Sequence, residues 1–374
     1  MLAIVAAAVI LGVLYLGREA LTPFVVGLLF VYLLSPGVEA LARRRVPRGL
    51  AILALYALVA FVLVEATGLL VRPLIDQLAL FIDGAPRYAA AIRDLLDGLA
   101  RSYQSLDLPP EVRRVVDDAL ARLAQTLAQV DPRVLLPVAT SLAALVGNVV
   151  GYLIIPVWAF YVLKDRHQLL RGLEGLLPPS WRDEARAIAG IVDRVVGRWL
   201  RGQLLLGLVV ATVTFVGLLA MGALVDPIFA RLAVLLAVIS GTLELLPIIG
   251  PTIAAVPAAL VGLTVSLEAT VAVVLLYVVI QLLENYLLVP KIQGDAVRLH
   301  PSVILFALVV GGTIAGLIGA ILALPVTAVA REIHEYLAAK LPDEAPATVD
   351  PAQIGTHALA QPVASEPVRR RRRR

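Results

Sequence analysis

Long apolar runs alternate with short charged breaks along most of this 374-residue chain. Three runs come first, at 1–17, 20–41 and 50–71, and each is close to the roughly 20 residues with which a helix crosses a bilayer. The loop between the second and third runs holds four arginines, and the positive-inside rule places such a loop in the cytoplasm. We therefore predict three transmembrane helices within residues 1–72, with the N-terminus in the cytoplasm.

Charged residues return at helical spacing in residues 73–137, with leucine and isoleucine between them. Such a pattern is typical of amphipathic helices, and the predicted topology puts this segment on the outer side of the membrane. We interpret it as an extracytoplasmic helical region and not as a site of chemistry. A further transmembrane helix is predicted at 138–163, and the arginine excess of 164–201 favours a cytoplasmic amphipathic region.

The next region, 202–338, contains two apolar stretches that glycine and proline interrupt, at 232–267 and 302–326. Paired interrupted stretches are typical of the broken helices of secondary transporters, whose free backbone groups must face protein or a water-filled cavity. If one of the two stretches is a re-entrant hairpin, the C-terminus returns to the cytoplasm, where an arginine-rich end is expected. We predict a transport core in this region, with a disordered basic tail at 339–374.

The composition narrows the class of protein. The hydrophobic content of 60% and the charged content of 16% both lie outside the range of soluble domains, which are about half apolar and about a quarter charged. The fold class is therefore predicted to be all-α, a polytopic membrane protein, and a soluble enzyme is excluded. The net charge is +4, but the six arginines at 369–374 supply more than that, so no nucleic-acid-binding surface is expected.

Few residues are available for enzymatic or metal chemistry. The chain has no cysteine and only four scattered histidines, which excludes thiolate metal sites and disfavours a site built from histidine. It also lacks the HExxH, G-x-S-x-G and P-loop motifs. We therefore predict no enzymatic activity, no cofactor and no bound metal.

Two glutamates stand out because they fall inside apolar segments. Glu244 lies in the segment GTLELLPIIGP, where proline and glycine should open the helix, and Glu284 lies near the cytoplasmic end of its span. Acidic residues at membrane depth usually face a bundle interior, a cavity or a partner. Because a carboxyl group there can take up and release a proton, coupling to protons or cations is chemically possible. The predicted substrate or ion pathway comprises Glu244, Pro247, Gly250, Pro251, Gln281, Glu284 and Asn285.

Each of these features could also serve the structure alone. Either glutamate could form an ion pair that only holds helices together, and the candidate partners are Arg201, Lys291 and Arg298. A cluster of glycines in the last interrupted stretch could serve close helix packing, although its position before a proline favours a hinge or a hairpin. That hinge or hairpin would contain Gly311, Gly312, Gly316, Gly319 and Pro325.

Several ordered motifs between residues 160 and 332 resemble one known family. They are FYVLKDRHQLLRGLEGLLPPSW, GRWLRGQLLLGLVV, LELLPIIGPTIAAVPA, QLLENYLLVPKIQGDAVRLHP and GGTIAGLIGAILALPVTAV. In this order they resemble the autoinducer-2 exporter family, AI-2E, also called the PerM-like permeases. Residues 1–71 are similar to the family in pattern only, and 73–137 in position only.

The resemblance implies a transporter of the bacterial inner membrane with about seven or eight membrane segments, some of them broken. It also implies a homo-oligomer, with a pentamer as one form. Members are associated with export of the quorum-sensing signal autoinducer-2 and others with Na⁺(Li⁺)/H⁺ antiport. The family's motif E-L/I-x-P-x-x-G-P falls on Glu244, Leu245, Pro247, Gly250 and Pro251. Its motif Q-x-x-E-x-x-x-x-x-P falls on Gln281, Glu284 and Pro290, and its motif R-G-Q falls on Arg201, Gly202 and Gln203. The resemblance therefore adds Arg201 and Gln203 to the predicted substrate or ion pathway. The pair Asn285–Tyr286 departs from the family pattern, so the substrate stays open.

Three functions are consistent with these observations. The first is a secondary transporter that exports a small polar metabolite with coupling to an ion. The second is a cation/proton antiporter that uses the same two glutamates. The third is a membrane scaffold whose region 73–137 binds partners. The expected surroundings are the same for all three: a lipid bilayer, multiple crossings and both termini in the cytoplasm.

Overall fold

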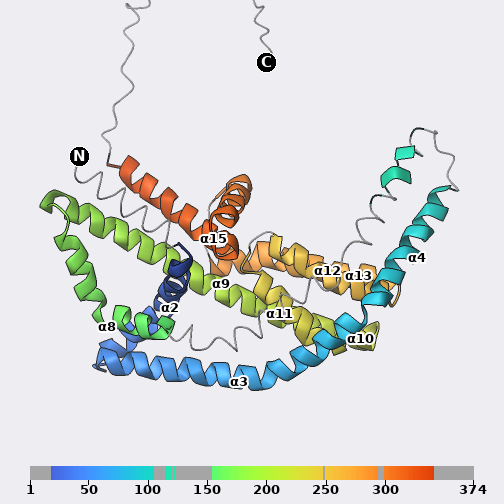
Figure 1. The fold of residues 1–374 in the computed structure, drawn as a ribbon, viewed down its shortest axis with the longest axis horizontal. Coiled ribbons are helices and arrows are strands. Elements are labelled where there is room, and N and C mark those ends of the chain that lie inside the picture. Colours follow the sequence, from blue (N-terminus) through green and yellow to red (C-terminus); the bar gives the residue numbers. More distant parts are fainter. Residues whose placement is uncertain are drawn as a thin grey trace, which may run out of the picture. The chain divides into compact units, whose positions relative to one another are not determined.

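The computed structural model describes residues 18–104, 111, 114–115, 117–119, 122, 154–246, 249–293 and 299–340. The described residues are helical and contain no strand, and five of their helices are long and apolar enough to cross a membrane (Figure 1). The predicted fold class, an all-α polytopic membrane protein, is confirmed. The first predicted helix, at 1–17, lies outside the described residues, as does most of the predicted tail.

The N-terminal part is a packed group of three helices. α2 (Arg18–Arg43) and α3 (Arg48–Asp83) are joined by a short basic turn, and α8 (Ile154–Gly175) packs against both. Their contact is apolar, with side chains such as Ile52 and Leu163 almost fully buried. α3 does not end near residue 72 but continues through Pro73, so the change from apolar to amphipathic sequence falls inside one helix.

The longest described helix, α9 (Arg182–Leu224), contains both the end of the charged region 164–201 and the start of the apolar region 202–338. Its 43 residues correspond to about 65 Å at 1.5 Å per residue, about twice the roughly 30 Å of a hydrocarbon core. Acidic residues in its first turn favour the helix start. The charged half of α9 therefore continues without a break into the apolar half that carries the core.

After α9 the chain folds into a tight helical hairpin. α10 (Pro227–Arg231), which Asp226 caps, leads into α11 (Ala233–Leu243), and α12 (Ile249–Leu263) follows after a short turn. At about 16 Å and about 22 Å these two apolar helices are both shorter than a bilayer crossing. Neither α11 nor α12 is therefore long enough to cross a bilayer by itself.

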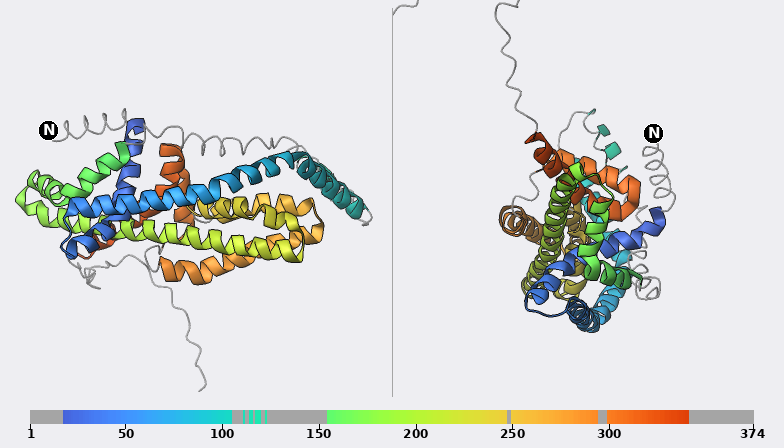
Figure 2. Two further views of the ribbon diagram at one scale, coloured as in Figure 1. Left: turned by 90° about the horizontal axis from the view of Figure 1, so that it is seen from below. Right: turned by 90° about the vertical axis from the view of Figure 1, so that its left-hand side faces the viewer.

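Glycines let this hairpin lie directly against α9. A Cβ atom on Gly207 of α9 would lie 2.7 Å from the carbonyl oxygen of Gly241 on α11, and one on Gly241 would lie 2.6 Å from the carbonyl oxygen of Gly207. α9 and α11 lie side by side in Figures 1 and 2. α13 (Leu267–Leu283) returns along α12 after the Ser266 N-cap. These helices share one apolar core, centred on residues such as Phe229, Leu236 and Val273.

The chain then forms η3 (Glu284–Leu288), a π-helical turn, α14 (Val289–Ile292) and finally α15 (Pro301–Ala338). α15 is itself broken: Ala315 and Gly316 leave helical geometry, and Gly316 has φ 59° and ψ −143°. Its two arms fold back on each other there, and Gly311 and Gly319 pack against each other's backbone. The break of α15 lies at Gly316, whereas the buried Pro325 lies inside a regular helical segment.

The last described residues belong to a separate compact unit. The chain divides into Met1–Glu332 and Ile333–Arg374. Within the second unit, the Lys340 ammonium lies 4.8 Å from the centre of the Tyr336 ring. This cation–π contact is local to the end of α15.

Replacing Gly316 by alanine should destabilise the α15 hairpin. A side chain at φ 59° and ψ −143° is strained, and such strain is of order 1–3 kcal/mol. We expect Gly316→Ala to lower the midpoint of thermal unfolding of the detergent-solubilised protein. Gly312→Ala is the matched control, because its Cβ would meet its nearest neighbour at 3.9 Å. Equal midpoints for the two variants would contradict this view of the break.

Candidate functional site

The tip of the α11–α12 hairpin carries a buried acidic residue. Glu244 follows α11 directly, and only 1% of its surface is exposed. The turn is held by backbone hydrogen bonds, among them Gly250 N to Leu246 O at 2.8 Å. Gly250 lies so close to the Leu243 carbonyl that no Cβ atom would fit. The glycine therefore allows the tight reversal that presents Glu244 at the tip.

A second acidic residue meets it from α13. Glu284 is the first residue of the π-helical turn, and 6% of its surface is exposed. The turn closes when Val289 N donates to the Glu284 carbonyl, five residues back. Single π-helical turns inside α-helices occur frequently at functional sites. Here the π-helical turn begins at Glu284, directly after the apolar helix α13.

The carboxyl groups of Glu244 and Glu284 are neighbours in this buried setting. A carboxylate has only acceptor atoms, so a hydrogen bond between the two groups requires a proton on one of them. The Oε2 atoms of Glu244 and Glu284 are buried and have no hydrogen-bond partner within the described part of the chain. We call Glu244 and Glu284 the carboxyl pair. A proton, a further donor or a cation would satisfy these oxygens.

Two amide side chains fix the hairpin tip from the opposite side. Gln203 of α9 donates its Nε2 hydrogen to the backbone carbonyl of Glu244, and Gln293 Nε2 donates to Gln203 Oε1 at 2.8 Å. Both glutamines are buried. One turn before the tip, the hydroxyl groups of Ser240 and Tyr277 are 3.2 Å apart and hydrogen-bond between α11 and α13. The carboxyl pair is therefore held between α9, the hairpin and α13.

The structure brings some of the predicted pathway residues together and separates others. Glu244 lies beside Glu284 and its backbone carbonyl accepts from Gln203, and Gly250 and Pro251 lie in the first turn of α12. Gln281 is half-buried and Asn285 is exposed, and neither takes part in the hydrogen bonds of the carboxyl pair. Pro247 lies outside the described residues.

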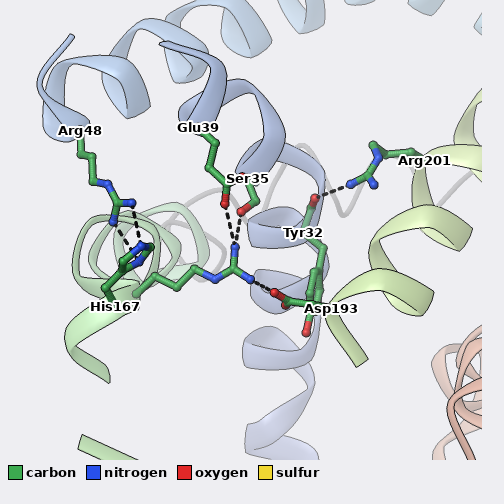
Figure 3. Close-up of polar contacts among 8 residues, drawn as sticks. Tyr32, Ser35, Glu39, Arg48, His167, Asp193 and Arg201 are labelled. Carbon is green, nitrogen blue, oxygen red and sulfur yellow. Dashed lines mark hydrogen bonds and ion pairs between the residues drawn. The ribbon is translucent and has the colours of Figure 1, made fainter. Parts of the chain in front are cut away.

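Arg201 lies on another side of α9 from Gln203. Its side chain is exposed, and its Nη1 donates to the backbone carbonyl of Tyr32 on α2 at 3.4 Å (Figure 3). No ion pair of Glu244 or Glu284 occurs among the described residues, which leave out Arg298. Neither Arg201 nor Lys291 therefore neutralises the carboxyl pair.

Sequence reasoning did not single out Gln293, Ser240 or Tyr277. Gln293 follows Glu284 by nine residues, in the stretch PKIQGD, and is the polar residue that reaches Gln203. A polar side chain between a proline-containing helix end and a glycine is common in turns, so the sequence carries no local signal for burial. Ser240 and Tyr277 resemble ordinary residues of apolar helices until their hydroxyl groups are placed together.

The chain is similar over most of its length to proteins named as transport proteins or permeases. The profile described as AI-2E family transporter matches residues 4–339. YrrI of Bacillus subtilis is 32% identical over 315 residues, which cover 83% of this chain and 84% of that protein. PerM of Escherichia coli is 28% identical over 340 residues, with coverages of 87% and 90%. A protein of Escherichia coli named AI-2 transport protein TqsA is 26% identical over 331 residues, with coverages of 86% and 87%.

Loss of the Gln203 side chain should destabilise the hairpin tip. Gln203→Leu would leave the Glu244 carbonyl and the Gln293 amide buried without their partners, and a buried polar group left unpaired costs about 1–3 kcal/mol. We expect a lower midpoint of thermal unfolding in detergent. Gln281→Leu serves as control, because Gln281 is half-buried in the same core region. A Gln203 variant as stable as the Gln281 variant would show that the amide network is not needed to hold the tip.

Proposed function

Because the chain belongs to the AI-2E transporter family, we propose that it is a secondary transporter that exports a small polar metabolite such as autoinducer-2, coupled to a proton or a cation. The chain is an integral membrane protein. The name of its relative TqsA supports autoinducer-2 as the solute to test first. The proposal also includes the bacterial inner membrane as location, both termini in the cytoplasm and a homo-oligomer, for which a pentamer is the form to test.

The carboxyl pair is the observation that carries the proposal. Glu244, at the tip of a hairpin too short to cross the membrane, is buried beside Glu284, and we propose that the two carboxyl groups share one proton. Loss of that proton would leave two carboxylates in contact, which repel each other. The site is then unfavourable until a proton, a cation or a hydrogen-bond donor of the solute takes the proton's place. Occupancy of one site can in this way couple two species.

The hairpin and the broken α15 helix suit such a cycle. Backbone groups freed by helix breaks are tolerated in a membrane only where they face protein or a water-filled cavity, and transporter sites commonly lie at such breaks. The tip at Glu244 and the break at Gly316 are two such places in this chain. We propose that movement of the α11–α12 hairpin relative to α9 exposes the carboxyl pair to one side of the membrane at a time.

A second function, Na⁺(Li⁺)/H⁺ antiport, is favoured by the free oxygens of the pair. The Oε2 atoms of Glu244 and Glu284 lack partners within the described residues, and carboxylate oxygens are the ligands that hard cations prefer. A Na⁺ or Li⁺ ion between the carboxylates would replace the shared proton without an organic solute. The scaffold function has no comparable observation in its favour.

Proton flux in proteoliposomes tests the proposal. An imposed pH gradient would be followed with an internal pH probe while Na⁺, Li⁺ or an autoinducer-2-like furanone is added in turn. We expect Glu244→Gln or Glu284→Gln to lower the coupled flux by about 10²-fold or more, as loss of an essential proton-transfer group does. Flux driven by the furanone alone would support export, and flux driven by Na⁺ or Li⁺ would support antiport.

Glu268→Gln is the matched control for these two variants. Glu268 lies in the first turn of the same helix α13 and is exposed, so its neutralisation should leave the flux unchanged. All variants must insert and assemble as the unmodified protein does, as judged by size-exclusion chromatography. Normal flux in both Glu244→Gln and Glu284→Gln would contradict the role of the carboxyl pair, whereas absence of flux in the unmodified protein with every solute would favour the scaffold function.

A further inference from the structure

Helix α2 lacks one backbone hydrogen bond, and a side chain of another helix supplies a donor in its place. Pro36 lies inside α2 and has no amide hydrogen, so the carbonyl of Tyr32, four residues earlier, has no helical donor. The guanidinium group of Arg201 on α9 donates to this carbonyl at 3.4 Å (Figure 3). Arg201 therefore supplies, from another helix, a donor that α2 itself lacks at this carbonyl.

A second arginine binds the same turn of α2 from a different helix. Arg166 of α8 donates to Ser35 Oγ at 2.6 Å and to Glu39 Oε1 at 3.3 Å, and it also forms an ion pair with Asp193 of α9. Ser35 precedes the proline directly. Figure 3 shows Ser35, Glu39 and Asp193 gathered around one guanidinium group. The break at Pro36 is thus bound to both α8 and α9.

The residues that follow Arg201 reach the candidate site. Gly202 faces α14, where a Cβ atom would lie 3.2 Å from Gln293 Cγ. Gln203 bonds to the Glu244 carbonyl and to Gln293. Three consecutive residues of α9 thus contact α2, the end of the α13–α14 segment and the hairpin tip. A shift of α9 at this point would change its contacts with α2, with the end of the α13–α14 segment and with the hairpin tip.

We propose that Arg201 is a positioning residue, which replaces the amide that Pro36 removes from α2 and thereby sets the place of Gln203 and of the carboxyl pair. The proposal rests on the proposed function in that the carboxyl pair is taken as the coupling site. Arg201 itself touches neither carboxyl group. It acts through the two residues that follow it, so its loss should change the site only as long as Pro36 leaves the Tyr32 carbonyl free.

Carbodiimide labelling in a double-substitution cycle tests this. Dicyclohexylcarbodiimide reacts with a protonated carboxyl group in an apolar setting, and mass spectrometry of peptides containing Glu244 and Glu284 gives the labelling rate without any need for a transported solute. We expect Arg201→Met to raise the rate by about threefold or more, a size typical of coupling between linked sites. In a Pro36→Ala background, where the alanine amide can serve Tyr32, the same change should have an effect of less than about 1.5-fold.

Two further variants keep the result decisive. Arg201→Lys retains a hydrogen-bond donor, so the carboxyl pair of this variant should be labelled at the rate of the unmodified protein. That result would show that the effect of Arg201→Met comes from loss of the donor and not from a folding defect. Arg198→Met removes an exposed arginine three residues earlier on α9 and should also leave the rate unchanged. Equal effects of Arg201→Met with and without Pro36 would overturn the proposal, as would no effect in either background.

The same proteins separate this proposal from the proposed function. If the unmodified protein is labelled at the carboxyl pair and the cycle shows the expected coupling, but no flux occurs with any solute, the proposed function fails and the role of Arg201 stands. If flux depends on Glu244 and Glu284 but the cycle shows no coupling, the role of Arg201 fails alone. Absence of labelling in every variant would overturn both, because the carboxyl pair would then carry no reactive proton.

Discussion

A polar group inside an apolar helix bundle must find its partner within the protein, and this constraint determines the arrangement around Glu244 and Glu284. No basic side chain among the described residues pairs with either glutamate. The two carboxyl groups are instead each other's neighbours, and the proposed shared proton gives each of them a partner. The same constraint acts on backbone groups, since the Glu244 carbonyl takes Gln203 and the Tyr32 carbonyl takes Arg201. Charge, hydrogen bonding and helix breaks are thus linked around α9.

Close backbone contact makes this arrangement possible. Gly207 and Gly241 let α9 and α11 touch, and Gly250 permits the turn that carries Glu244. The hairpin is short, its apolar faces pack against α9 and α13, and its tip is bound by side-chain hydrogen bonds. A buried carboxyl pair at such a tip has properties that ion coupling requires, since it is withdrawn from solvent and can take up a proton or a cation.

The fold class could be predicted from run lengths, since repeated apolar stretches near 20 residues with few charges are typical of membrane-spanning helices. The cost of a carboxylate at membrane depth likewise singled out Glu244 and Glu284. Their direct contact could not be predicted, because it depends on depths set by an 11-residue α11 and a 17-residue α13 and on a π-helical turn with no sequence signature. The roles of Gln293 and of the Tyr32 carbonyl could not be predicted from the sequence either, since each depends on a partner at least 90 residues away in the sequence.

The shared proton is the central claim, and infrared difference spectroscopy between H₂O and D₂O observes it most directly. Purified protein at neutral pH should show the carbonyl stretch of one protonated carboxyl group with the isotope shift of an exchangeable proton. Glu244→Gln and Glu284→Gln should each remove this band, because the glutamine amide donates to the remaining carboxylate and no proton is needed. A band that persists in both variants, or no band in the unmodified protein, would contradict the account.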